Sequence, residues 1–258
     1  MSKKLNRTSD EVAAREIQTI PTSLEKRAAM PYASLPAPNR YRHASIVASM
    51  FVSLAESKYQ LDYASREIAQ DLANGAQWKA ECGGLVVNEK LPKTATWSLF
   101  LHDVGLVTAF GTEADRARLA GFPSEQINGS PENSSPGCEV ARLWKNWLGT
   151  GVLPPDALAR ELYRAGADDA DRWDRQWTHG IARALSAIHT RDRASLVDGL
   201  EEIAAFTEHM AWRGEWQRLG EGRLSLVGLG LCRMARNIGL APIVKSIYIP
   251  VELLESGE

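Results

Sequence analysis

The C-terminal stretch from Arg223 to Leu254 constrains the fold more than any other part of this 258-residue chain. Apolar residues recur in its first half at steps of three and four, which is the period of one face of an α-helix. Further apolar residues lie on the opposite side, so we expect this helix to be enclosed by other helices. The first set is Leu224, Val227, Leu231, Ala235 and Ile238, and the second set is Leu226, Leu229 and Met234.

The glycines in and after this helix support further predictions. Gly228 and Gly230 lower helix propensity, so we expect a neighbouring backbone to approach closely at both positions. Gly239 is predicted to end the helix in the left-handed conformation, and Pro242 prevents its continuation. The following segment, Ile243 to Val251, is rich in β-branched residues and is predicted to be extended.

The same stretch resembles the C-terminal signature of a known family. A leucine-rich helix is followed by an Arg-x-x-Gly-Leu step and a Leu-Leu ending, through Arg236–Leu240, Ser246, Tyr248, Pro250, Leu253 and Leu254. This pattern is similar to that of the immunity protein 49 family of bacterial polymorphic toxin systems, and the order of helices from about Arg40 onward is similar too. The resemblance implies an antitoxin that binds a cognate toxin domain, encoded next door, and neutralises it by occlusion.

The composition indicates which kinds of binding partner and which cellular compartment to expect. Thirty basic and 32 acidic residues give a net charge of −2, which argues against a nucleic-acid partner. No apolar run approaches the roughly 18 residues that span a bilayer, and the N-terminus lacks the apolar core of a signal peptide, so we expect a cytoplasmic protein without a membrane partner. Cys82, Cys138 and Cys232 form no paired motif and are expected to be reduced. The pattern does not predict the oligomeric state.

Hydrophobic periodicity predicts an all-α fold: an array of antiparallel helical hairpins in one globular domain, with a short extended C-terminal segment. Residues 1–39 are predicted to form a partly irregular N-terminal arm with a short helix from Asp10 to Ile17, and residues 40–258 a single helical domain. We interpret the arm as a strap packed along the domain, the alternative being a flexible contact arm. An exposed loop is expected at about 124–137, where Asn, Ser, Pro and Gly are concentrated.

Within the domain, the first hairpin is predicted to turn near Tyr59–Gln60 and to end at Gly83–Gly84. Later helices are predicted over Trp97–Phe110, Asp115–Ala120, Gly137–Leu148, Pro155–Ala165, Arg172–His189 and Ala194–Trp212. Three tryptophan pairs lie on one side of their helices: Trp144/Trp147, Trp173/Trp177 and Trp212/Trp216. We favour anchors that fill gaps between helices over an aromatic binding surface.

One motif suggests an alternative function. Leu101–Gly105 contains His102 and Asp103 and resembles the His-Asp pair of helical metal-dependent phosphohydrolases, with His43 upstream as a further ligand. Leu106 stands where that family usually has lysine, and no later aspartate stands in a matching context. The competing interpretation places His102 and Asp103 near the start or on the exposed side of the helix from Trp97. We therefore predict no catalytic residue, no metal and no cofactor, and a helical scaffold or regulatory protein is a second alternative.

An acidic cluster is the candidate toxin-binding site. It consists of Asp168, Asp169, Asp171 and Asp174. Helical isoprenoid enzymes bind magnesium through two adjacent aspartates and a third acidic residue three positions later, but Arg172 occupies that place here. The cluster suits the positive end of the helix that begins near Arg172. It would also steer a toxin whose cleft is basic, as in a toxin that attacks nucleic acid.

Overall fold

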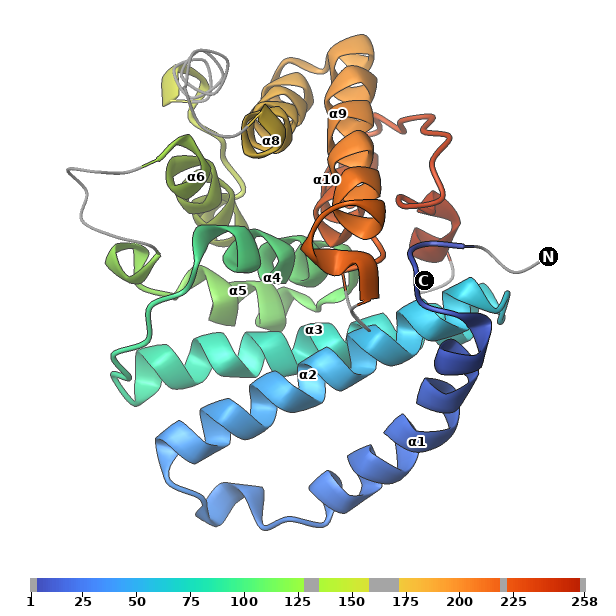
Figure 1. The fold of residues 1–258 in the computed structure, drawn as a ribbon. Helices are drawn as coiled ribbons and strands as arrows, with labels where there is room; N and C mark the ends of the chain where they lie inside the picture. Colours follow the sequence, from blue (N-terminus) through green and yellow to red (C-terminus); the bar gives the residue numbers. More distant parts are fainter. Residues whose placement is uncertain (1–3, 128–134, 158–171, 219–221, 256–258) are drawn as a thin grey trace.

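Antiparallel helix pairs make up most of the computed structural model, which describes residues 4–127, 135–157, 172–218 and 222–255 (Figure 1). One pair is α2 (Ala37–Gln60) with α3 (Ser65–Asn88), and another is α8 (Arg172–Thr190) with α9 (Arg193–Trp212). Over the described residues the only β-type pairing is an isolated bridge between Ala95 and Ile127. The predicted all-α array of helical hairpins is therefore confirmed.

The remaining helices are arranged around these pairs. They are α1 (Asp10–Ala28), α4 (Trp97–Phe110), α5 (Glu113–Ala120), α6 (Pro136–Thr150) and α10 (Leu226–Asn237). Figure 1 shows α1 on one side of the α2–α3 pair and the other helices on the opposite side. None of the described helices is long and apolar enough to cross a membrane.

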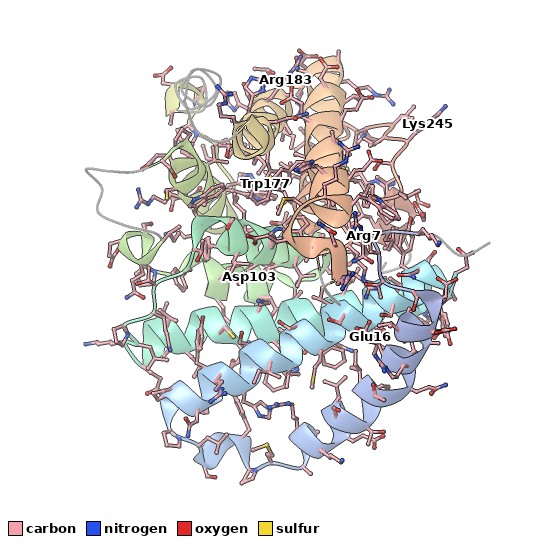
Figure 2. The ribbon with its side chains drawn as sticks, viewed as in Figure 1. Arg7, Glu16, Asp103, Trp177, Arg183 and Lys245 are labelled. Carbon is pink, nitrogen blue, oxygen red and sulfur yellow. The ribbon has the colours of Figure 1, made fainter. Side chains whose placement is uncertain are left out.

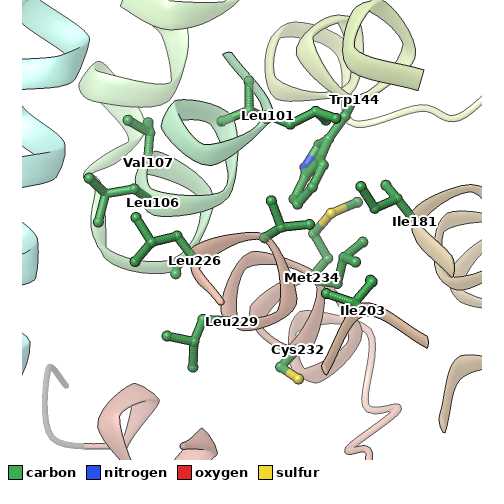
Figure 3. Close-up of a cluster of buried hydrophobic side chains, with 14 of the residues drawn as sticks. Leu101, Leu106, Val107, Trp144, Ile181, Ile203, Leu226, Leu229, Cys232 and Met234 are labelled. Carbon is green, nitrogen blue, oxygen red and sulfur yellow. The ribbon is translucent and has the colours of Figure 1, made fainter. Parts of the chain in front are cut away.

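Helix α10 lies in the centre of the core. Every residue from Leu226 to Cys232 is buried, which confirms the predicted enclosed helix. Figure 3 shows it surrounded by apolar side chains of the neighbouring helices, such as Leu101 of α4, Trp144 of α6 and Ile203 of α9. Ser225 caps its first turn, because its hydroxyl accepts a hydrogen bond from the Gly228 N–H at 3.2 Å.

Glycines bring α4 and α10 into backbone contact. A Cβ atom added to Gly230 would lie 2.7 Å from the carbonyl oxygen of Gly105, and one added to Gly105 would lie 2.6 Å from the carbonyl oxygen of Leu226. A Cβ added to Gly228 would meet the side chain of Ile249 at 2.6 Å. The predicted close approach is thus confirmed: to another helix at Gly230 and to the C-terminal segment at Gly228.

The chain after α10 stays on the domain through specific contacts. Gly239 has a φ of +77°, which confirms the predicted left-handed stop. Residues 240–250 contain no regular strand or helix, and the 3₁₀ helix η5 (Val251–Leu254) follows. Leu253 and Leu254 are fully buried, and Arg233 donates a hydrogen bond of 2.9 Å to the Leu254 carbonyl. Several residues of the family-like pattern therefore hold this segment in place.

A buried polar network joins the N-terminal helices to the start of α10. Arg223 is fully buried and donates hydrogen bonds to the side chains of Gln60 at 3.0 Å and Glu16 at 3.2 Å. Glu56 is also fully buried; it accepts the Leu224 N–H at 2.7 Å and lies 3.5 Å from the Arg223 Nε. Figure 2 shows Glu16 on α1. Three parts of the chain that are distant in sequence thus share one charged cluster.

Several predicted boundaries differ from the structure. Helix α1 extends over 19 residues to Ala28, with Pro21 inside it, instead of ending at Ile17. A proline within a helix removes one backbone hydrogen bond, and the packing of α1 along α2 outweighs that cost. Helix α3 continues past Gly83–Gly84 to Asn88. A Cβ on Gly83 would lie 3.2 Å from the Leu119 side chain, so this glycine admits α5 and does not end the helix.

The later helices agree more closely with the prediction. The ends of α4, α5, α6, α8 and α9 lie within two residues of the predicted ones. Of the helix predicted from Pro155 to Ala165, residues 155–157 are helical and the rest lies outside the described residues. The loop expected at 124–137 is only partly exposed: Glu125 is exposed, but Ile127 is fully buried and pairs with Ala95, and α6 begins at Pro136. Residues 128–134 lie outside the described ranges.

Candidate functional site

The predicted acidic cluster falls largely outside the described residues. Asp168, Asp169 and Asp171 belong to the undescribed stretch 158–171. Asp174 lies in the first turn of α8, and its side chain is not described either. The toxin contact predicted for these four residues stays a prediction.

The structure separates His43 from the other two residues of the metal-site alternative, His102 and Asp103. The ring of His43 packs against Tyr32 and Trp78, with centroid distances of 5.3 and 5.8 Å. The ring of His102 lies instead near Trp177 and Trp216, at 5.5 and 5.2 Å. Among the described residues, no group of three or more His, Cys, Asp and Glu side chains is placed to hold a metal ion.

His102 and Asp103 line a small pocket of about 260 Å³ between α4 and its neighbours. Burial lowers the pKa of His102 to about 4, and the positive charge of Lys79 acts in the same direction. Asp103 forms an ion pair of 2.8 Å with that same Lys79. Figure 2 shows Asp103 on α4 and Trp177 on α8. The imidazole is therefore neutral near pH 7 and the carboxylate is already paired, which is the arrangement of a structural contact.

The tryptophans serve mainly as anchors, as predicted, but Trp212 and Trp216 do not share a helix: α9 ends at Trp212, and Trp216 lies in the 3₁₀ helix η4 (Glu215–Arg218). Trp144 is fully buried and Trp177 is 2% exposed, while Trp147, Trp212 and Trp216 are partly buried against the core. The side chain of Trp173 is not described. The Trp177 ring stacks on Phe206 at 4.8 Å, which fixes α8 against α9.

A groove runs along α9 beside the C-terminal segment. Its larger part has a volume of about 600 Å³, and it adjoins a second depression of about 480 Å³ that shares two residues with it. We call the two together the α9 groove, which is lined by Glu201, Ala204, Ala205, Glu208, His209, Trp212, Arg213 and residues 243–248. Sequence analysis did not predict this groove.

The two walls of the α9 groove differ in chemistry. Glu201 and Glu208 are seven residues apart, so they lie on the same exposed face of α9, and neither forms an ion pair with another described residue. Ile243 and Ile247 of the opposite wall are 67% and 45% exposed. Lys245 lies between them in sequence, on the outer edge of the molecule in Figure 2. The groove therefore offers two isoleucine side chains opposite two carboxylates.

Tyr248 fixes the wall that carries the isoleucines. Its hydroxyl accepts a hydrogen bond from Trp212 Nε1 at 2.8 Å and donates one to the Leu5 carbonyl at 3.2 Å. Its carbonyl accepts the Ser225 N–H at 2.8 Å. The segment has no regular secondary structure, yet these contacts hold it against α9 and the N-terminus.

Other acidic residues of α9 are neutralised within the α8–α9 pair. His179 of α8 contacts Glu202 at 2.7 Å, and Arg183 pairs with both Glu202 and Asp198. Figure 2 shows Arg183 near the top of the view. Glu201 and Glu208 thus differ from the other carboxylates of α9 in having no internal partner among the described residues.

Comparison with known proteins adds no relative: no family model matches the chain, and the searches of curated proteins and of solved structures gave no match.

Proposed function

We propose that this protein is an immunity protein that binds a cognate toxin domain and neutralises it by occlusion, with the α9 groove as the contact surface. The proposal rests first on the resemblance of the C-terminal pattern to the immunity protein 49 family. The observation that supports it in the structure is the pair of exposed isoleucines, Ile243 and Ile247, on the segment that Tyr248 anchors, beside two carboxylates that form no ion pair with the described residues. Rigid apolar anchors with a polar rim are typical of protein–protein interfaces.

The two walls of the α9 groove have different roles in the proposed toxin binding. Ile243 and Ile247 lose exposed apolar area when a partner covers them, which favours binding. Glu201 and Glu208 attract a basic partner surface and set its orientation, because carboxylates that form no ion pair within the described part of the chain are available to lysine or arginine. A stable interface buries roughly 1,200–2,000 Å² in total, so the groove would form its centre and the surrounding surface its rim.

We do not propose the metal-dependent phosphohydrolase, because His43 lies in a different cavity from His102 and Asp103. A scaffold or regulator that uses the same groove would differ in its partner and would not protect cells from a toxin. A growth assay therefore separates these functions.

The test is co-expression with the C-terminal domain encoded immediately upstream. The proposal expects that this domain alone stops growth, that the present protein restores growth, and that the two co-purify. A harmless neighbouring domain, or a toxic one that the protein neither rescues nor binds, would overturn the proposal.

A pair of variants tests the groove itself. Ile243→Glu/Ile247→Glu should weaken toxin binding by about 1,000-fold, since removing two interface anchors costs about 2 kcal/mol for each. Val152→Glu is the matched control, because Val152 is 64% exposed, follows α6 and does not line the α9 groove. Equal rescue and affinity for the double variant, the control and the unmodified protein would exclude the α9 groove as the contact surface.

A further inference from the structure

A second cavity lies between α1 and α2, away from the α9 groove. Figure 1 shows α1 close to α2 at the start of α1 and separated from it toward Ala28. The space between them is a cavity of about 480 Å³, which we call the α1–α2 cavity. Residues that line it include Leu24, Ala28, Tyr32, His43, Phe51 and Trp78. A volume of this size is within the range of small-molecule sites, which are mostly apolar and aromatic.

Three rings form one end of this cavity. Tyr32 lies 5.3 Å from His43 and 5.5 Å from Trp78, the latter in an edge-to-face arrangement, and His43 lies 5.8 Å from Trp78. The Tyr32 hydroxyl donates a hydrogen bond of 3.1 Å to Glu81, so it is already satisfied. Aromatic surfaces of this kind favour contact with another flat ring.

His43 contributes a polar atom without a partner. Its side chain is 5% exposed, and its Nδ1 makes no hydrogen bond with any described residue. Burial lowers the pKa of His43, and the positive charge of Arg27, which also lines the cavity, lowers it further. The imidazole is therefore neutral near pH 7, and each of its nitrogens is either a donor or an acceptor. A buried polar atom left unpaired is unfavourable, and a ligand that pairs with it removes that cost.

We propose that the α1–α2 cavity binds a small neutral phenol, with its ring against Tyr32 and Trp78 and its hydroxyl hydrogen-bonded to His43 Nδ1. A hydroxyl both donates and accepts, so it pairs with either tautomer of the histidine. Most of the lining is apolar or aromatic, which disfavours a charged ligand, and the two charged residues of the lining, Glu25 and Arg27, are opposite in sign and favour neither a cation nor an anion. This inference is independent of the toxin-binding proposal, because it concerns other residues and a different side of the molecule.

Binding of para-fluorophenol to the full chain, followed by fluorine NMR, tests the proposal, with fluorobenzene as the ligand that lacks the hydroxyl. We expect saturable binding of para-fluorophenol, about tenfold tighter than that of fluorobenzene, which is the contribution of roughly one hydrogen bond. Absence of saturable para-fluorophenol binding would overturn the proposal, and so would equal affinity for the two compounds.

Two variants locate the site. His43→Leu should weaken para-fluorophenol binding about tenfold and leave fluorobenzene binding unchanged, because only the hydroxyl loses its partner. His189→Leu, at an exposed position near the end of α8, is the matched control and should bind like the unmodified protein. Ala28→Trp places an indole at the mouth of the cavity from an exposed helix position and should abolish binding of both compounds. If His43→Leu does not fold, as judged by circular dichroism, unchanged binding by Ala28→Trp overturns the site.

Discussion

Arg223 places a positive charge where its side chain has no exposed surface, between α1, α2 and the start of α10. The fully buried Glu56 lies beside it and also accepts the Leu224 N–H. A buried ion pair of this kind is expensive to break, since removing one member leaves the other charge uncompensated. The free energy of folding should therefore depend strongly on this single side chain.

We predict that Arg223→Met lowers the free energy of unfolding by roughly 3–5 kcal/mol, as measured by urea denaturation. The added change Glu56→Gln should restore part of the loss, because the unpaired buried carboxylate is then absent. Arg15→Met, at an exposed position of α1, is the control and should have little effect. A loss for Arg223→Met no larger than that of the control would show that the network does not stabilise the fold.

The second prediction at this scale concerns the pH dependence of stability. The pKa of His102 in the folded protein is lowered to about 4 by burial and by Lys79, below its ordinary value near 6.5. Between these values the unfolded chain binds a proton at this site and the folded chain does not, so stability falls as the pH drops from about 6.5 to 4. His102→Phe keeps a ring between Trp177 and Trp216 and should flatten this slope. The measurement is the urea midpoint at several pH values, and an unchanged slope for the variant contradicts the assignment.

At the scale of helices, small residues decide how closely two elements approach. The α4–α10 contact has room for no side chain at Gly230, where a Cβ would lie 2.7 Å from the Gly105 carbonyl. Gly84 of α3 is also helical, but the nearest atom to a Cβ there is Arg118 Cδ at 3.9 Å. A side chain therefore has no space at Gly230 and has space at Gly84.

We predict opposite effects of the same substitution at these two positions. Gly230→Ala should lower the free energy of unfolding by about 1–3 kcal/mol, because the added methyl group pushes α10 from α4. Gly84→Ala should raise it by about 0.5–1 kcal/mol, because alanine favours the helix and meets no obstacle. Urea denaturation of both variants checks this, and a similar change in sign and size for both would contradict it.

The sequence predicted the helices with a regular apolar face better than it predicted the helix ends. The periodic stripes of α4, α6, α8 and α9 placed those helices nearly correctly, because each helix buries one regular face. The ends predicted at Gly83–Gly84 and at Ile17 are wrong, because packing against α5 and α2 overrides the local preference of these stretches. Packing against neighbouring helices determines where these helices end, and a single sequence does not show which helices are neighbours.

At the scale of the whole molecule, the two ends of the chain meet at the α9 groove. The Leu5 carbonyl accepts the hydroxyl of Tyr248, and Asn6 donates a hydrogen bond of 3.0 Å to the Trp216 carbonyl. Sequence analysis identified the C-terminal segment as important and did not predict the groove, because the groove arises only when residues 243–248 lie beside α9. The one available signal was the spacing of Ile243 and Ile247 in a segment without helical structure.

The last prediction concerns this connection between the chain ends. Deleting residues 1–6 removes the acceptor of the Tyr248 hydroxyl and the fully buried Leu5 side chain, so residues 243–250 should be held less firmly. We expect the amide hydrogens of Tyr248 and Ile249, which are hydrogen-bonded to Ser246, to exchange at least about tenfold faster, which corresponds to the loss of roughly one hydrogen bond and its packing. Amides of α3 should be unaffected, and Lys4→Ala, at an exposed position, is the matched control.

Tyr248→Phe should have a similar effect on the segment. Combining it with the deletion should have a smaller effect than the sum of the two separate effects, because both changes remove the same contact. If the deletion leaves exchange at Tyr248 and Ile249 unchanged, α9 alone holds that wall of the groove and the N-terminus is not part of its support.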